Sequence, residues 1–470
     1  MFKCDDNITL SEKEMHDFMH KALKKALESC DQVEIYGEWG DVLSIDLERE
    51  EVEKVKHVKS TGIGVRVVIS NKIGFSYTTA LEKTRIEECV EHAIKQAKIS
   101  EQDPHFHGLP ALASEASKRS YTEPEKTFDP QILELLEGGG EDAIEYCKEM
   151  LTGMKEYEVR KSVTCTPTEG SFAAAHDETY ILNSEGIETS NTGTYVSAGI
   201  MVVASEGGRE ETPGYESKVS RMLSDMDFEW IGREAVKMGV DSLGGKKLKT
   251  KEIPVVFSPR AVQSLLAYTL IPQLSAENVQ RKQSPYHGKK GQEIASEILT
   301  IVDDGTMPSG VNSRKMDGEG VPSQPTNLVE KGVLKNFLYD SYTAGKDGVE
   351  STGNAIRSFS NLPTPGATNF IINAKSKASK EEIFSEIHEG LFVNDVIGAH
   401  TASRASGDFS VVAQNAFGIK KNDLYPVTQV MLAGNMQEVL KHLEMVGNDT
   451  RQFYNVVSPS IMVSKMQVVS

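Results

Sequence analysis

The distribution of turn-forming residues changes near residue 250, and this change restricts the folds that the chain can adopt. Before it, a series of strand-like runs is followed by an amphipathic helix, and this order occurs twice. From Ile253 onward, short alternating segments are separated by Gly, Pro and Asn, with few helices between them. Strands covered by a helix form an α/β layer, whereas closely spaced short strands are typical of a sandwich or barrel. The sequence therefore predicts an α+β protein, with an N-terminal α/β domain over residues 1–245 and a β-rich, barrel- or sandwich-like C-terminal domain over residues 246–470.

The N-terminal half is predicted to contain two strand-then-helix units. Apolar residues at helical spacing predict helices near residues 15–30, 84–99, 142–154 and 227–243. Alternating runs predict the following strands: Val33–Trp39, Val42–Leu47, Val52–Val58, Gly62–Ser70, Ile73–Thr79, Lys161–Pro167, Glu178–Asn183, Gly186–Thr192 and Thr194–Ala204. Asn71-Lys72 predicts a hairpin turn, and Asn183-Ser184-Glu185-Gly186 separates two strands. The proline-bearing stretch 104–131 predicts a surface connection between the units.

The C-terminal half is predicted to consist mainly of short strands. The expected strands are Ile253–Phe257, Glu297–Val302, Asn327–Glu330, Val333–Tyr339, Thr368–Asn373, Phe409–Ala416 and Val427–Ala433. Helical spacing is visible in Ala261–Leu274, Lys380–His388 and Met436–Val446.

Composition disfavours nucleic-acid and membrane roles. The chain of 470 residues carries 51 basic and 69 acidic residues, a net charge of −18, whereas a protein that grips a phosphate backbone normally carries a basic face. No apolar run approaches the roughly 18 residues that span a bilayer. The N-terminus is acidic where a signal peptide needs an apolar stretch, and the five cysteines form no C-x-x-C pair, which is typical of free thiols. We therefore expect a cytoplasmic protein.

Several short segments, spread over nearly the whole chain, resemble one family. They are Gly62-Ile63-Gly64-Val65-Arg66, Asn183-Ser184-Glu185-Gly186, Gly291-Gln292-Glu293-Ile294-Ala295-Ser296, Val302-Asp303-Asp304-Gly305-Thr306, Asp317-Gly318-Glu319-Gly320-Val321-Pro322, Leu362-Pro363-Thr364-Pro365 and Met445-Val446-Gly447-Asn448-Asp449. In this order and at this spacing, they resemble the TldD/PmbA family, also named modulators of DNA gyrase. Gly398-Ala399-His400 and Gly407-Asp408-Phe409-Ser410 are closer to its PmbA/TldE branch.

The resemblance implies a two-domain fold and a specific place to look for a metal. The active member, TldD, resembles a zinc peptidase with H-E-x-x-x-H on a helix and a distant cysteine. Histidines on neighbouring helical turns can bind one ion, and the glutamate can activate its water. The matching positions here are Ala267, Tyr268 and Pro272, and the cysteine position falls at or beside Pro459. We therefore expect no zinc, and no other cofactor, in this chain.

The leading hypothesis from this resemblance is a non-catalytic, TldE/PmbA-like subunit of a TldD/TldE-type zinc metallopeptidase. A TldD-type subunit would supply the zinc in a heterodimer that degrades or matures unfolded peptides, and the isolated chain could form a homodimer. Two alternatives stay open: an autonomous peptidase with a relocated metal site, and a regulatory protein that binds a topoisomerase such as gyrase.

Three polar residues of the C-terminal half are candidates for lining a peptide channel or an interface. His287 precedes Gly288, His400 lies two residues after Gly398, and Asp408 follows Ser406-Gly407. Because no metal-ligand spacing connects them, a structural role for each is the simpler hypothesis.

Overall fold

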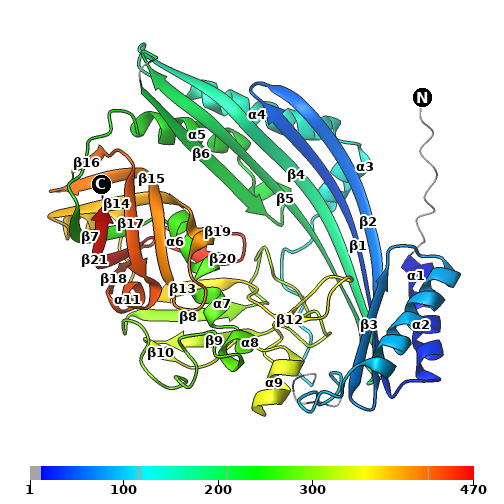
Figure 1. Cartoon of the computed structure of the whole chain (residues 1–470). Helices are drawn as coiled ribbons and strands as arrows, with labels where there is room; N and C mark the ends of the chain where they lie inside the picture. Colours follow the sequence, from blue (N-terminus) through cyan, green and yellow to red (C-terminus); the bar gives the residue numbers. More distant parts are fainter. Residues whose placement is uncertain are drawn as a thin grey trace.

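The computed structural model describes residues 12–112, 114, 116, 118–208, 210–421 and 423–469. A long, curved sheet from the N-terminal half arches over a group of smaller sheets from the C-terminal half (Figure 1). This arrangement confirms the predicted α+β class with a β-rich C-terminal region. Among the described residues, the helices are too short or too polar to cross a bilayer.

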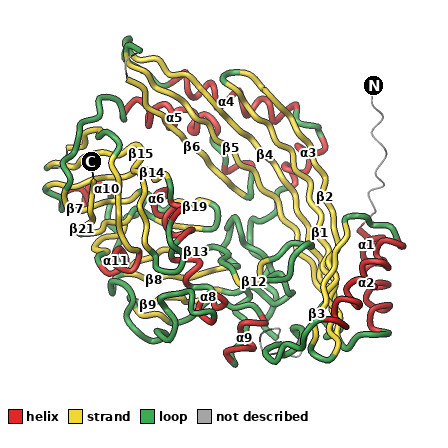
Figure 2. Tube along the Cα trace, viewed as in Figure 1, coloured by secondary structure: helices red, strands yellow, loops and turns green. Residues whose placement is uncertain are grey.

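The N-terminal sheet is antiparallel throughout, with the strand order β3-β2-β1-β4-β5-β6. Its strands are β1 (Gln32–Glu48), β2 (Glu51–Ile69), β3 (Lys72–Thr78), β4 (Val163–Asn183), β5 (Glu188–Glu206) and β6 (Glu210–Ser220). Because a strand rises about 3.3 Å per residue, the 21 residues of β4 span roughly 70 Å. Figure 2 shows these long strands running side by side over the C-terminal half.

Helices cover one face of this sheet in two groups. They are α1 (Glu12–Leu27) and α2 (Lys83–Ile99) at one end, and α3 (Pro130–Glu137), α4 (Glu141–Glu156) and α5 (Phe228–Asp241) at the other. Val33 and Ile35 of β1 are buried in the core with the first group, and Leu43 and Leu47 are buried with the second. Side chains alternate along a strand, so the even-numbered residues of β1, such as Glu34, point to the opposite face, toward the C-terminal half.

The N-terminal strands are longer and fewer than the sequence predicts. Pairs of predicted strands merge: β1 contains the first two, β2 the next two, β4 joins Lys161–Pro167 to Glu178–Asn183, and β5 joins Gly186–Thr192 to Thr194–Ala204. β6 and α3 are additional elements. The turn after β4 is confirmed, since the Asn183 N–H donates to the Ile187 carbonyl over 2.9 Å. The hairpin turn between β2 and β3 is centred on Ser70 and Asn71, both with positive φ, one residue earlier than predicted.

The stretch 104–131 is not simply a surface connection. Phe106 and Leu109 are buried against Val68 of β2. Tyr121 donates its hydroxyl to the Gly320 carbonyl in the C-terminal half over 2.8 Å. This stretch therefore contributes to holding the two halves together.

One C-terminal sheet closes on itself. Its strands are β7 (Lys251–Phe257), β14 (Glu389–Ile397), β15 (Asp408–Lys420), β16 (Asp423–Pro426), β17 (Val430–Asn435), β18 (Leu443–Val446) and β21 (Ile461–Val469). They follow the order β14-β7-β21-β17-β15-β16, with β18 paired to β21, and pairing of β14 with β15 closes a ring. Closure removes exposed edges, as in a barrel.

A second C-terminal sheet and several short helices complete the fold. The sheet, in the order β10-β9-β8-β13-β20-β19, consists of β8 (Leu299–Asp304), β9 (Pro325–Glu330), β10 (Val333–Leu334), β13 (Phe370–Ala374), β19 (Arg451–Phe453) and β20 (Val456–Ser458). β11 (Ala355–Ile356) and β12 (Thr364–Pro365) form a small ribbon. The helices are α6 (Pro259–Tyr268), α7 (Leu270–Gln273), α8 (Ala276–Gln280), α9 (Ser341–Asp347), α10 (Lys380–Ser385) and α11 (Met436–Lys441), with single 3₁₀ turns η1 (Leu223–Asp225) and η2 (Ala399–Thr401).

Several C-terminal predictions need correction. The predicted helix Met436–Val446 ends at Lys441 and continues as strand β18, and the predicted strand Val333–Tyr339 is limited to β10. The predicted helix Ala261–Leu274 is interrupted at Thr269. β14 and β21 are unpredicted strands of the ring.

Candidate functional site

Helix α6 carries Ala267 and Tyr268, the positions that the resemblance matches to the first histidine and the glutamate of H-E-x-x-x-H. It begins at Pro259, and the Ser258 hydroxyl accepts a hydrogen bond from the Ala261 N–H over 3.2 Å, as is typical of an N-cap. It ends at Tyr268, because Thr269 leaves helical geometry and donates its hydroxyl to the Leu265 carbonyl over 2.6 Å.

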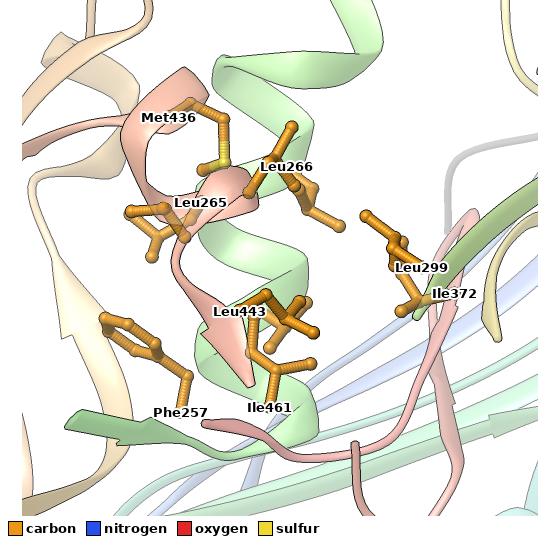
Figure 3. A pocket seen from close by; sticks show the side chains of 11 residues that line it. Phe257, Leu265, Leu266, Leu299, Ile372, Met436, Leu443 and Ile461 are labelled. Carbon is orange, nitrogen blue, oxygen red and sulfur yellow. The ribbon is translucent and has the colours of Figure 1, made fainter. Parts of the chain in front are cut away.

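The three matching positions lie on the partly accessible side of α6 and α7. Ala267, Tyr268 and Pro272 are partly exposed, whereas Leu265 and Leu266 are buried in the C-terminal core. Figure 3 shows these two leucines among apolar side chains. The void that they line has a volume of about 10 Å³, so it is a packing gap rather than a ligand site. A methyl group and a pyrrolidine ring offer no donor atom to a metal. Among the described residues, no group of three or more His, Cys, Asp or Glu side chains is arranged to hold a metal ion.

The distal position lies in a buried turn beside α6. β20 packs against α6, and Ser458, Pro459 and Ser460 at its end are all buried. The Ser460 N–H and hydroxyl donate to the two Asp449 carboxylate oxygens over 2.8 and 2.7 Å. Burial raises the pKa of Asp449, but these hydrogen bonds and nearby Lys380 outweigh it, so the pKa is lowered and the carboxylate stays charged. The turn therefore has a structural role.

The structure places His400 near the helix but does not join the three candidate polar residues. His400 lies in η2, and its ring meets the Tyr268 ring edge-on, with centroids 6.5 Å apart. Asp408 accepts hydrogen bonds from Asn435 Nδ2 (2.8 Å) and from the Ser406 hydroxyl (2.6 Å), and both lower its pKa.

His287 lies apart, after α8, and donates from Nδ1 to the Val279 carbonyl over 3.0 Å. Within the described part of the chain, no hydrogen bond or ion pair joins His287, His400 and Asp408. A role for these three residues in lining a peptide channel or an interface stays a prediction.

Comparison with known proteins assigns the chain to a family. Models of the PmbA/TldA metallopeptidases match residues 33–97 (domain 1), 139–243 (central domain) and 250–470 (C-terminal domain). The chain belongs to the PmbA/TldD family. A relative from Methanocaldococcus jannaschii, the uncharacterized protein MJ0231, is 33% identical and the match covers 89% of this chain and 92% of the relative. Metalloprotease PmbA of Escherichia coli O157:H7 is 26% identical over 99% of this chain and 98% of its own length. The crystal structure of TldE from Thermococcus kodakarensis superposes with a TM-score of 0.84, at 25% identity, over 96% of this chain and 100% of that one.

The PmbA/TldD segment 317–322 belongs to a buried charge cluster between the two halves, which sequence reasoning missed. Arg66 of β2 donates to Glu34 of β1 over 2.6 Å and to Glu319 over 3.1 Å. Arg357 also binds Glu34, and all four side chains are at most 5% exposed. Arg66 and Glu319 both lie in segments that resemble the family, and this could have marked them as candidates. Their pairing with each other depends on tertiary structure and cannot be predicted from the sequence.

The carboxyl groups of this cluster differ in how they respond to burial. Burial raises the pKa of Glu34, but Arg66 and Arg357 outweigh it, so the pKa is lowered and Glu34 stays charged. Burial and the neighbouring Glu319 raise the pKa of Asp317 to about 7. Asp317 accepts hydrogen bonds from three backbone N–H groups, those of Glu319, Val321 and Ala355.

A second charge cluster attaches α6 of this PmbA/TldD chain to the sheet edge. Glu216 of β6 is buried between Arg260, in the first turn of α6, and Arg451 of β19. Arg451 donates from two nitrogens to the two Glu216 oxygens, both over 3.0 Å, and stacks over Trp230 of α5. The helix that would carry metal ligands is therefore fixed against the N-terminal sheet.

Proposed function

We propose that this chain is a TldE/PmbA-like, non-catalytic subunit of a zinc metallopeptidase in the cytoplasm, paired with a TldD-type subunit that supplies the metal. The observation that carries the proposal is the identity of the α6–α7 positions. Metal-assisted hydrolysis needs several convergent donors and an open coordination position, whereas Ala267 and Pro272 present carbon atoms and Tyr268 is no carboxylate.

The N-terminal sheet supports a role in holding peptide substrate. Its face opposite the helices carries small side chains in register on three neighbouring strands: Ser44 pairs with Ala173, and Ala173 with Ser197. A row of small side chains leaves room for an extended segment of varied sequence, and selection would then favour unfolded peptides over any one side chain. In this proposal the chain forms one wall of a channel that leads to the zinc of the partner.

The test compares the chain alone with the chain plus a partner that carries H-E-x-x-x-H. We expect the chain alone to bind no stoichiometric zinc, measured by elemental analysis, and to cleave no unfolded peptide. The mixture should cleave, and replacement of the partner's first motif histidine by alanine should abolish cleavage. Stoichiometric zinc together with peptidase activity in the single chain would overturn the proposal.

The same assay distinguishes the proposed non-catalytic subunit from an autonomous peptidase with a relocated metal site. An autonomous peptidase that used His287 and His400 would lose activity in the H287A and H400A variants without any partner present. A non-catalytic subunit predicts that both variants support the partner's activity at nearly the wild-type rate.

A further inference from the structure

A groove lies in the C-terminal half where its two sheets separate. It is lined by residues at the start of β8, in the turn after β9, at the end of β13 and in strand β18. β8 and β13 pair as far as Leu299 and Ala374 in the second sheet, whereas β18 pairs with β21 in the ring. This β8–β18 groove has a volume of about 800 Å³, which lies in the range of small-ligand sites. In Figure 1, β8 and β18 lie at the lower left, away from the long N-terminal sheet.

The β8–β18 groove lies on the other side of β8 and β13 from helix α6. Leu299 and Ile372 line the small void under α6. Their neighbours Thr300 and Asn373, which pair with each other, line the groove instead. Successive side chains of a strand point to opposite faces, so this pair of strands separates the groove from α6. A ligand in the groove is therefore distinct from anything bound at the exposed side of α6.

Part of the groove lining is apolar. Ile298, Ala374 and Met445 are partly buried, and Val446 is buried. Removal of apolar surface from water favours association. This part of the lining therefore favours a ligand that carries at least one apolar side chain.

Charged side chains of both signs also line the groove. Lys331 and Lys375 supply positive charges, and Glu297 and Glu444 supply negative charges. Among the described residues, none of these four side chains has a hydrogen-bond or ion-pair partner. Lys331 is held beside β8, because its N–H donates to the Thr300 hydroxyl over 3.4 Å. Each pair attracts one sign of charge and repels the other, so an anion alone or a cation alone fits only half of the charged lining.

We propose that the β8–β18 groove binds short peptides with free termini. The peptide carboxylate faces Lys331 and Lys375, the terminal ammonium faces the two glutamates, and an apolar side chain contacts Ile298 and Met445. A tetrapeptide in extended form spans roughly 13 Å at about 3.3 Å per residue, and it combines two charged ends with apolar side chains. Molecules of this class are the products of peptide hydrolysis, and the chain belongs to a metallopeptidase family. The inference does not depend on which subunit holds a metal, nor on the small-residue face of the N-terminal sheet.

Blocked peptides test the recognition of each terminus. The probe is the tetrapeptide alanyl-leucyl-alanyl-leucine, and isothermal titration calorimetry measures its binding to the full chain in three forms: free, N-acetylated and C-amidated. We expect the free form to bind. Either block should weaken binding by about fivefold, which is the upper end of what an exposed ion pair contributes.

Two variants assign each terminus to its side chains. K331Q/K375Q should weaken the free and acetylated peptides by about fivefold and leave the amidated peptide unaffected, because that peptide has no carboxylate. E297Q/E444Q should weaken the free and amidated peptides and leave the acetylated peptide unaffected, because that peptide has no ammonium group. A folding defect would weaken all three forms, so this crossed pattern separates recognition from loss of structure.

K335Q/E330Q is the matched control. It removes an exposed ion pair of 3.3 Å at the β9–β10 hairpin, outside the groove lining, and should bind every form like the wild type. A wild type that does not bind the free tetrapeptide, or that binds all three forms equally, would overturn the proposal. Groove variants that bind every form like the wild type would overturn it too, because the peptide would then bind elsewhere, for example on the helix-free face of the N-terminal sheet. An effect of amidation without any effect of acetylation would do the same, since the groove would then recognise anions in general.

Discussion

Glu34 is a buried carboxylate, and two arginine side chains balance its negative charge. The side chain is 0% exposed and binds both Arg66 and Arg357. A buried ion pair contributes little relative to a well-packed apolar group, but removal of one partner leaves an unpaired buried charge. Arg66 lies in the same sheet, and Arg357 lies in the C-terminal half. The loss of Glu34 would therefore remove one ion pair within the N-terminal sheet and one ion pair between the two halves.

We therefore expect Glu34→Gln to lower the free energy of unfolding by about 3–5 kcal/mol. The amide keeps the size of the side chain but removes the carboxylate that the two guanidinium groups share, and Arg66 keeps its hydrogen bond to Glu319. Urea unfolding followed by circular dichroism measures the change. Lys155→Gln is the control, because its pair with Glu50 is exposed, and such pairs contribute about 1 kcal/mol or less. Equal stability of the two variants would contradict this account of the cluster.

Among the secondary-structure elements, α6 contributes to stability through packing and through an ion pair in its first turn. Its buried side faces the apolar core of the C-terminal half, and its first turn is attached to β6 through Glu216 and Arg260. The positions that matter for stability are therefore the buried leucines, not the three positions that would bind a metal.

Leu265→Ala should lower the free energy of unfolding by about 2–5 kcal/mol, because it enlarges an existing void under α6. Gln263→Ala is the matched control on the partly exposed side of the same helix and should change the free energy of unfolding by about 0.5 kcal/mol or less. Thermal and urea unfolding of both variants provide the measurement. A small effect of Leu265→Ala would mean that the core collapses readily around the gap.

Some secondary-structure elements of this fold can be predicted from the sequence, and others cannot. Periodicity located α2, α4 and α5 correctly, since their buried residues recur at helical spacing. The predicted strands break at Gly40-Asp41 and at Lys59-Ser60-Thr61, although both segments lie inside the β1–β2 pairing. Gly and Asp are depleted in strands, but a strand with one solvated face tolerates them. β21 was unpredicted although its apolar alternation is a strand signal.

For the site, the correspondence of the α6 positions and the Pro459 segment with a metal motif stays a prediction, and the sequence did not reveal the charge clusters. β20, which leads into Pro459, packs on α6. By contrast, Glu34 and Arg357 are 323 residues apart in the chain, and no local pattern connects them. The sequence also did not indicate that His287 and His400 lie apart, because the distance between them depends on the tertiary structure.

In the whole molecule, the two halves are joined at several places besides Tyr121, and three of these contacts involve arginine side chains. One is the Glu34 cluster, and another is the Glu216 cluster. At the third, Arg221 at the end of β6 donates to the Gly310 and Ser313 carbonyls over 3.4 and 3.0 Å. Three separate attachments resist hinge motion, so the position of the sheet over the C-terminal half is fixed.

The Glu34 cluster also makes this attachment sensitive to pH. Burial and Glu319 raise the pKa of Asp317 to about 7 and that of Asp340 to about 6, from an ordinary value of 3.8. A raised pKa means that the folded chain holds the proton more tightly than the unfolded chain. The stability contributed by these two groups is therefore fully present below about pH 3.8 and is lost as pH rises toward 7. Glu34 acts oppositely, since its lowered pKa makes its contribution disappear only when pH falls below its ordinary value of 4.5.

We therefore expect the free energy of unfolding to decline as pH rises from 5 to 7, and the decline to be smaller in Asp317→Asn, which cannot titrate. The asparagine should lower stability at every pH, because its amide nitrogen cannot accept the backbone N–H groups that Asp317 binds. The informative quantity is thus the slope against pH in urea unfolding, not the stability at one pH. Asp317→Asn with Asp340→Asn should flatten the slope further, whereas Asp142→Asn on the exposed start of α4 should keep it. An unchanged slope in the double variant would show that other groups carry the pH dependence and that the junction between the halves is not its source.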